Sequence, residues 1–333
     1  MSRALYELTV PADSARLENN FMAIEKVILA KPRGFCAGVE MAIESVDRAL
    51  AQHGAPLYVF HEIVHNQNVV GNFKQKGVVF VNSIAEVPAG SNVIFSAHGV
   101  SPAIRQQAKE KQLHWIIDAT CPLVDKVHRE VRRFVAQDYW IILVGHRDHD
   151  EIVGTSGEAP QRTLVVENVA DAKAIMPPNP EKLVVLTQTT LSVDDTKEII
   201  DILKQRFPKM ITPAKEDICY ATQNRQDAVK QLALQVDLVL VIGSKNSENS
   251  NQLVKVARAL GKPAYLIDDH SAVDAQWLHG IATVGITSGA SVPEQLVQQA
   301  VEFFQSQGAT VEQIGLVEEN IHFALPSEVT APQ

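Results

Sequence analysis

The chain has 333 residues, of which 46% are hydrophobic and 21% are charged, and its net charge is −9. This composition is that of a folded protein large enough for more than one lobe, and an acidic chain without concentrated Lys and Arg is not expected to bind nucleic acid. No apolar stretch reaches the 18 residues that a membrane span needs. The first 24 residues carry acidic side chains and lack the apolar segment of a secretory signal, so we expect an N-terminal extension on a cytoplasmic protein that does not contact a membrane.

From Val27 onward, short apolar runs rich in β-branched residues alternate with helical patterns. The runs are residues 27–30, 57–60, 78–81, 93–95, 115–117, 140–144, 164–166, 183–186, 238–242, 264–267 and 282–286. This alternation predicts an α/β fold with mainly parallel sheets and helices on both faces. One sheet with so many strands would be unusual, so we expect several smaller sheets.

The three cysteines of the chain, Cys36, Cys121 and Cys219, stand in the same local context. Each lies just before an expected helix, whose N-terminus is expected to lower the pKa of the thiol. Because the cysteines divide the chain into similar segments, we expect three small lobes in a pseudo-threefold arrangement around a common centre. The expected parts are an extension at 1–24, lobes at 25–121, 122–215 and 216–305, and a C-terminal segment at 306–333 that returns to the first lobe.

Three widely spaced cysteines are compatible with more than one role. A structural zinc site usually takes four ligands in paired C-x-x-C spacings, which this sequence lacks. Three thiolates can instead hold a [4Fe–4S] cluster and leave one iron open as a Lewis acid. Three buried structural cysteines are the other interpretation, and spacing alone does not decide between these two.

Polar residues follow many of the expected strands, at the ends where parallel sheets bind ligands. Helix capping explains any one of these turns, but the series of them favours a shared pocket for a small phosphorylated molecule. No P-loop and no G-x-G-x-x-G motif after a strand occurs, so we expect no nucleotide or nicotinamide site. His65, His98 and His149 are metal ligands, phosphate donors or buried core histidines by this reasoning, and Glu151 is a proton donor only if its pKa is raised.

Seven long motifs resemble those of the IspH/LytB family, the 4-hydroxy-3-methylbut-2-enyl diphosphate reductases. They are PRGFCAGV at 32–39, HEIVHN at 61–66, FSAHGV at 95–100, DATCPLV at 118–124, TQTTLSVDDT at 187–196, DICYAT at 217–222 and GSKNS at 243–247. The resemblance runs in order from about Val27 to Phe323.

The resemblance implies a three-lobed cloverleaf around one oxygen-sensitive [4Fe–4S] cluster, which Cys36, Cys121 and Cys219 hold with an open fourth iron. It implies the reductive dehydroxylation of (E)-4-hydroxy-3-methylbut-2-enyl diphosphate to isopentenyl and dimethylallyl diphosphate, the last step of the methylerythritol phosphate route to isoprenoids. Ferredoxin or flavodoxin is the implied electron donor. The implied catalytic residues are Glu151, Thr189 and His149, and the implied contacts to the allylic diphosphate are His65, His98, His149, Thr189, Ser247, Asn249 and Ser291.

One position departs from the family pattern. Where members commonly read Ser-Ser-Asn, this chain reads Ser247-Glu248-Asn249. A carboxylate would repel a diphosphate, so we expect Glu248 to offer only its backbone N–H and to turn its side chain away. Two other functions stay open at this point, a non-redox hydro-lyase with a three-cysteine cluster and a cluster-binding regulatory protein without catalysis.

Overall fold

The computed structural model describes residues 24–213, 216–315 and 317–330. The expected N-terminal extension at 1–24 lies, apart from its last residue, outside the described residues. No described helix is both long enough and apolar enough to cross a membrane.

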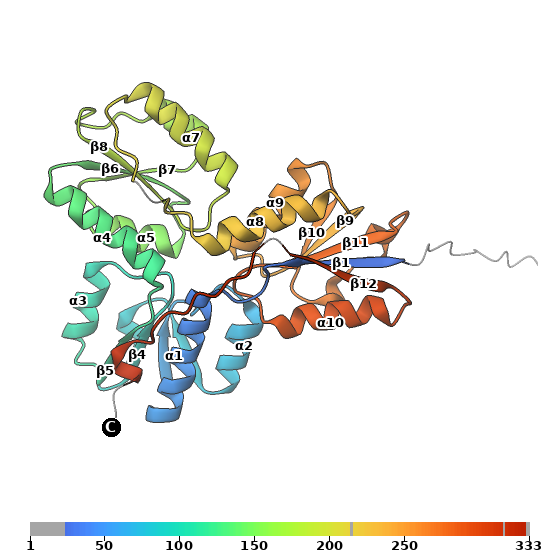
Figure 1. Cartoon of the computed structure of the whole chain (residues 1–333). Coiled ribbons are helices and arrows are strands. Elements are labelled where there is room, and N and C mark those ends of the chain that lie inside the picture. Colours follow the sequence, from blue (N-terminus) through green and yellow to red (C-terminus); the bar gives the residue numbers. More distant parts are fainter. Residues whose placement is uncertain (1–23, 214–215, 316, 331–333) are drawn as a thin grey trace, which may run out of the picture.

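The described strands form three separate sheets, and every strand pair within them is parallel (Figure 1). The largest has the order β10 (Ala264–Ile267), β9 (Leu238–Ile242), β11 (Thr283–Ser288), β1 (Lys26–Lys31) and β12 (Thr310–Gly315). The second has the order β3 (Val78–Val81), β2 (Leu57–Phe60), β4 (Asn92–Phe95) and β5 (Trp115–Asp118). The third has the order β7 (Thr163–Val166), β6 (Trp140–Val144) and β8 (Leu183–Thr187). The predicted α/β class with several parallel sheets is confirmed.

Helices connect these strands and cover the sheets. They are α1 (Ala37–His53), α2 (Gln67–Gln75), α3 (Pro102–Glu110), α4 (Pro122–Ala136), α5 (Asp150–Ser156), α6 (Val169–Ala174), α7 (Val193–Arg206), α8 (Tyr220–Ala233), α9 (Glu248–Ala259) and α10 (Glu294–Gln305). Short 3₁₀ turns are η1 (Ile84–Glu86), η2 (His270–Ala272), η3 (Ala275–Leu278) and η4 (Ser327–Val329).

Strand β1 is covered by helices on both faces, which explains its unbroken run of apolar residues. Val27 and Leu29 pack into a core with α10, whereas Ile28 and Ala30 pack into a core on the other face with α8 and α9. A strand covered by helices on both faces buries every side chain, so its sequence reads as continuously apolar rather than alternating.

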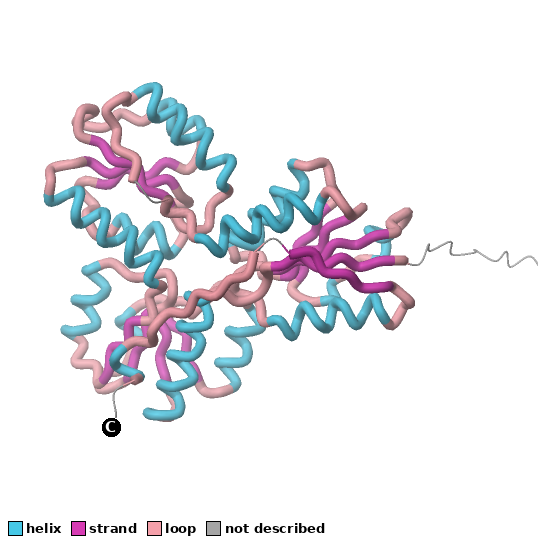
Figure 2. The backbone as a smooth tube through the Cα atoms, viewed as in Figure 1, coloured by secondary structure: helices cyan, strands magenta, loops and turns pink. Residues whose placement is uncertain are grey.

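The first and last strands of the described chain are neighbours in the five-stranded sheet, and the segments that follow them both run to the four-stranded sheet. Strand β1 lies between β11 and β12, and the chain passes from it into α1, which packs on the four-stranded sheet. After β12 the chain runs back across the molecule to η4, which packs against α1 and β5 (Figure 2). Val329 in η4 is buried in the same core as Val46 and Val59, so the last segment completes the lobe of the four-stranded sheet.

Candidate active site

The three cysteines begin three different helices. Cys36, Cys121 and Cys219 are the N-cap residues of α1, α4 and α8, and none of their sulfurs makes a capping hydrogen bond. All three thiols are free, and all three line one cavity with about 690 Å³ of atom-free space, part of it open to solvent. The sulfurs therefore face a common space from three helix ends.

A glycine keeps the space between the sulfurs clear. Gly38 lies in the first turn of α1, and a Cβ atom at this position would be 2.6 Å from Cys121 Sγ and 4.0 Å from Cys36 Sγ. No side chain other than hydrogen fits at that distance without moving the thiol. Three free thiols around a cleared space are the donor set that a three-cysteine iron–sulfur cluster requires, so the described residues fit this cofactor.

Burial controls the ionisation of two of these thiols in the metal-free protein. It raises the pKa of Cys121 above the usual thiol range and the pKa of Cys219 to about 11, and the neighbouring Cys36 adds to both shifts. The backbone N–H groups of Leu123 and Val124 at the start of α4 lower the pKa of Cys121 only in part. The helix ends therefore lower the pKa values of Cys121 and Cys219, as expected, but desolvation outweighs this effect. A metal that replaces the proton would reverse this preference.

Glu151 and Thr189 form a buried pair at the same cavity. Glu151 is in the first turn of α5 and Thr189 follows the end of β8, and these residues are only 2% and 4% exposed. The backbone N–H of Thr189 donates to Glu151 Oε1 at 2.7 Å, and its hydroxyl contacts Oε2 at 2.8 Å. Burial raises the pKa of Glu151 to about 7, although both hydrogen bonds from Thr189 lower it. The carboxyl group is therefore poised to hold or release a proton near neutral pH.

Three histidines meet on another side of the cavity. The rings of His65 and His98 are stacked with centroids 4.0 Å apart, and His149 stands edge-on to them at 5.3 and 5.9 Å. Burial lowers the pKa of His98 well below its usual value and that of His149 to about 4, and electrostatic interaction with His65 acts in the same direction. His149 Nδ1 also accepts the N–H of Glu151 at 3.1 Å, which leaves its proton on Nε2. In the ligand-free pocket His98 and His149 are neutral at pH 7.

The five-stranded sheet supplies hydroxyl and amide groups. Ser247 is the N-cap of α9, and its hydroxyl accepts the backbone N–H of Ser250. Asn249 donates to Thr222 Oγ1 at 3.2 Å and accepts the backbone N–H of Ala290 at 2.9 Å. Ser291 donates its hydroxyl to the carbonyl of His65 at 2.9 Å, which joins this side of the pocket to the histidines.

The structure brings the predicted residues together. Every one of them lines the same cavity: Cys36, His65, His98, Cys121, His149, Glu151, Thr189, Cys219, Ser247, Asn249 and Ser291. Their individual roles stay predictions.

Glu248 has partners of its own. Its carboxylate accepts a hydrogen bond from Gln252 and lies 3.1 Å from His146 Nε2 and 3.7 Å from Lys255 Nζ. Burial acts to raise the pKa of Glu248, but the contact with His146 holds it below its usual value, so the group is ionised. The residue also lines the cavity, so its negative charge lies at the pocket edge, shared with two basic side chains.

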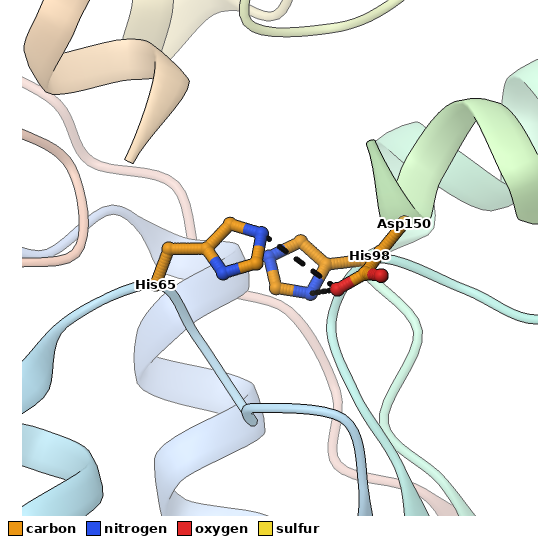
Figure 3. A group of neighbouring side chains, drawn as sticks. All are labelled: His65, His98 and Asp150. Carbon is orange, nitrogen blue, oxygen red and sulfur yellow. Dashed lines mark ion pairs between the residues drawn. The ribbon is translucent and has the colours of Figure 1, made fainter. Parts of the chain in front are cut away.

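Sequence reasoning did not single out Asp150 or His61. Asp150 Oδ1 lies 2.6 Å from His61 Nδ1. Asp150 Oδ2 lies 3.8 Å from His65 Nε2 and 4.0 Å from His98 Nδ1 (Figure 3). The signal that could have found Asp150 is its place in the sequence between His149 and Glu151. Thr222, whose hydroxyl is 3.2 Å from Cys219 Sγ, was also not singled out, although it ends the DICYAT motif one turn after the cysteine.

The chain is similar to known proteins over most of its length. Residues 27–305 match the family described as LytB protein. The chain is 52% identical over 306 residues to the 4-hydroxy-3-methylbut-2-enyl diphosphate reductase of Streptomyces avermitilis, with 91% of this chain and 90% of that protein covered. It is 53% identical over 307 residues to the protein of the same name from Mycolicibacterium paratuberculosis, with 92% of each covered.

Solved structures agree with these relatives. The E-1-hydroxy-2-methyl-but-2-enyl-4-diphosphate reductase of Plasmodium falciparum superposes with a TM-score of 0.89 at 40% identity, and 92% of this chain and 97% of that chain are covered. A second structure, described as (E)-4-hydroxy-3-methyl-but-2-enyl diphosphate reductase, the terminal enzyme of the non-mevalonate pathway, has a TM-score of 0.61 at 31% identity, with 85% of this chain and 99% of that chain covered. The chain therefore belongs to the LytB (IspH) family of 4-hydroxy-3-methylbut-2-enyl diphosphate reductases, which carry a [4Fe–4S] cluster.

Proposed function

We propose that this protein catalyses the reductive dehydroxylation of (E)-4-hydroxy-3-methylbut-2-enyl diphosphate, the terminal step of the non-mevalonate pathway. The reaction breaks the allylic C–O bond, consumes two electrons and two protons, and yields water with isopentenyl or dimethylallyl diphosphate. The observation that carries the proposal is one cavity that joins three free thiols, a buried carboxyl group with a pKa of about 7, and a set of imidazole, hydroxyl and amide groups.

Cys36, Cys121 and Cys219 would hold one [4Fe–4S] cluster. With three protein ligands, the bound cluster would supply electrons one at a time and one iron that no side chain of this site occupies. The thiols must stay reduced to receive iron, which is compatible with the cytoplasm, the reducing compartment where we expect the protein. The electrons would come from a small redox partner, ferredoxin or flavodoxin.

The diphosphate would lie against His65, His98, Ser247, Asn249 and Ser291. These residues offer N–H and O–H donors of the kind that bind phosphate oxygens. The contact between Ser291 and the carbonyl of His65 ties the two halves of this surface together, so both would move as one body.

Glu151 would supply protons to the departing hydroxyl group. With a pKa of about 7, close to half of the carboxyl groups are protonated at neutral pH, which is the condition for an efficient general acid. Thr189 contacts both carboxylate oxygens and would orient the substrate hydroxyl and relay the proton, while the edge-on ring of His149 would help to orient the substrate.

An anaerobic assay tests this function. Protein reconstituted with iron and sulfide is given the hydroxylated diphosphate and a strong reductant such as reduced methyl viologen, and the products are identified by chromatography. We expect isopentenyl and dimethylallyl diphosphate, and we expect Cys→Ser replacement at 36, 121 or 219 to remove iron and activity together. Turnover that needs no electron donor would point to a hydro-lyase, and a stable cluster without turnover would point to a regulatory protein.

A further inference from the structure

The cavity lacks the fixed positive charge that a diphosphate normally meets. No Lys or Arg stands among the described residues that line it. A phosphate ester carries close to two negative charges at pH 7, and a diphosphate ester carries more. Two carboxylates, Glu248 at the edge and Asp150 beside the histidines, add negative charge. Protons taken up by the pocket, or a bound cation, would offset this negative charge in the complex.

The stacked histidines are placed to accept protons. Asp150 Oδ2 lies 3.8 Å from His65 Nε2 and 4.0 Å from His98 Nδ1, and Glu62 Oε2 lies 3.6 Å from His65 Nδ1. These distances suit ion pairs but are too long for hydrogen bonds. Both carboxylates therefore lie close enough to stabilise a protonated ring. His149 is less suited, because its Nδ1 already accepts the N–H of Glu151.

Asp150 is held in this position from the neighbouring lobe. His61 follows β2 in the four-stranded sheet, has a left-handed backbone with φ of 60°, and stacks on Phe60 with ring centroids 4.2 Å apart. Its Nδ1 lies 2.6 Å from Asp150 Oδ1. This contact points the other carboxylate oxygen of Asp150 at His65 and His98, as Figure 3 shows.

We propose that diphosphate binding is coupled to proton uptake by the stacked pair His65–His98, and that Asp150 is the positioning residue that makes this uptake favourable near neutral pH. The proposal rests on the proposed function, because it assumes that the diphosphate contacts these two histidines.

The sign of the pH dependence follows from charge. In the ligand-free pocket, burial and the neighbouring histidines hold the pKa of His98 well below its usual value. A bound diphosphate favours the protonated ring and raises that pKa, so affinity increases as pH falls from the bound-state pKa towards the ligand-free pKa. The other titratable groups that act on or contact the pair are His61, Glu62, His149 and Asp150. Glu151, Glu248 and the three cysteines line the same cavity, and His146 acts on His149.

Isothermal titration calorimetry tests the proposal on anaerobic, cluster-loaded protein. Isopentenyl diphosphate is the probe, and its binding is measured between pH 6.5 and about 8.5 in two buffers with different ionisation enthalpies, which counts the protons taken up. ³¹P NMR of the bound probe counts the protons that the diphosphate itself gains. All variants carry Glu151→Gln as background, so that the titration of this carboxyl group does not contribute.

Asp150→Asn is compared with Asp148→Asn, which removes the same charge from an exposed position in the loop just before α5. We expect proton uptake in the background protein and in the Asp148→Asn variant. In Asp150→Asn we expect the midpoint of the affinity–pH profile to fall by about one pH unit, and uptake above pH 7 to fall with it. Asp150→Glu should restore the uptake, which a purely structural role of Asp150 would not predict.

Three results would overturn the proposal. One is binding without proton uptake by the protein, and another is an Asp150→Asn profile that matches the Asp148→Asn profile. The third is binding that needs added Mg²⁺ or Zn²⁺ and is lost with EDTA, because His65, His98 and Asp150 have donor atoms within 4.8 Å of one another and could hold such an ion. In each case turnover by the wild-type protein would leave the proposed function standing, whereas failure of both substrate and product to bind would defeat the function itself.

Discussion

Thr189 contacts both carboxylate oxygens of Glu151, one through its backbone N–H at 2.7 Å and the other through its hydroxyl at 2.8 Å. The backbone contact needs an unprotonated oxygen, so it leaves the proton of a neutral Glu151 on Oε2. A hydroxyl both donates and accepts, so the contact to Oε2 survives in either protonation state. The pair can therefore pass a proton without movement of its heavy atoms.

Glu151→Gln should abolish most turnover while the site stays assembled. The amide oxygen of glutamine can accept the N–H of Thr189, and its NH₂ group can donate to the Thr189 hydroxyl, so both contacts survive. Since the proton is lost, we expect kcat to fall by about 10²- to 10⁴-fold. The measurement is anaerobic turnover together with iron content and the Kd for the substrate. Glu110→Gln, at an exposed position on α3, is the control, and near-normal turnover of the Glu151 variant would remove this residue from the mechanism.

The rate should fall as pH rises above about 7. Burial raises the pKa of Glu151 to about 7, so the protonated donor is present below that pH and is lost above it. Thr189→Val removes a hydrogen bond that lowers this pKa, so the descending limb of the kcat–pH profile should move to higher pH. Thr190→Val is the matched control, because the Thr190 hydroxyl accepts from Gln188 instead. If the descending limb of the kcat–pH profile did not move in Thr189→Val, the group that titrates would not be Glu151.

Gly38→Ala should impair cluster loading without unfolding the protein. The added methyl group would lie 2.6 Å from Cys121 Sγ, so the thiol would have to move. Gly71→Ala is the control, since it is also a helical glycine, in α2, but has open space around its Cβ position. There alanine should stabilise the helix by about 0.5–1 kcal/mol. The measurement is the iron and sulfide content per chain of the two variants, and thermal unfolding checks that both are folded. Equal iron contents would show that the clearance at Gly38 is not needed.

Glu248→Gln should strengthen diphosphate binding. The change removes a negative charge from the edge of the cavity, but His146 and Lys255 already offset part of that charge. We therefore expect a gain of only roughly 2- to 5-fold in affinity at low salt, with a smaller gain at high salt because ions screen the interaction. Calorimetry with isopentenyl diphosphate at two ionic strengths measures the effect. Glu302→Gln, exposed on α10, should leave the affinity unchanged, and weaker binding in Glu248→Gln would mean that the carboxylate helps to order the site.

The fold class was predictable because its signal is local, but the pairing of strands was not. Each apolar run in the sequence became a strand, since parallel strands covered on both faces need unbroken apolar sequence. The edge strand β12 was missed because Thr310–Gly315 is mostly exposed and carries no apolar run. The position of β1 beside β11 and β12 was also hidden, because a contact between residues more than 250 positions apart leaves no local pattern.

The site, like the fold, was predictable where the signal is local and not where it depends on long-range contacts. Motifs identified the residues that line the cavity. They could not show that burial raises the pKa of Cys121 more than the helix end lowers it, because desolvation depends on the whole packed interior. Asp150 escaped notice because its importance comes from His61, His65 and His98, which the fold brings to it from another sheet.

The position of β1 also determines when the five-stranded sheet can form during synthesis of the chain. This strand is made well before its partners, which begin only at Thr283 and Thr310. It must wait unpaired until those strands have been made, and an unpaired apolar strand is a site for aggregation. The backbone N–H of Cys36 donates to the carbonyl of Ala290 at 3.2 Å, so the surroundings of this thiol are complete only after residue 290 has been made. Iron–sulfur assembly machinery would therefore meet a chain made past β11, and demand for chaperones should be greatest for chains stalled before β12.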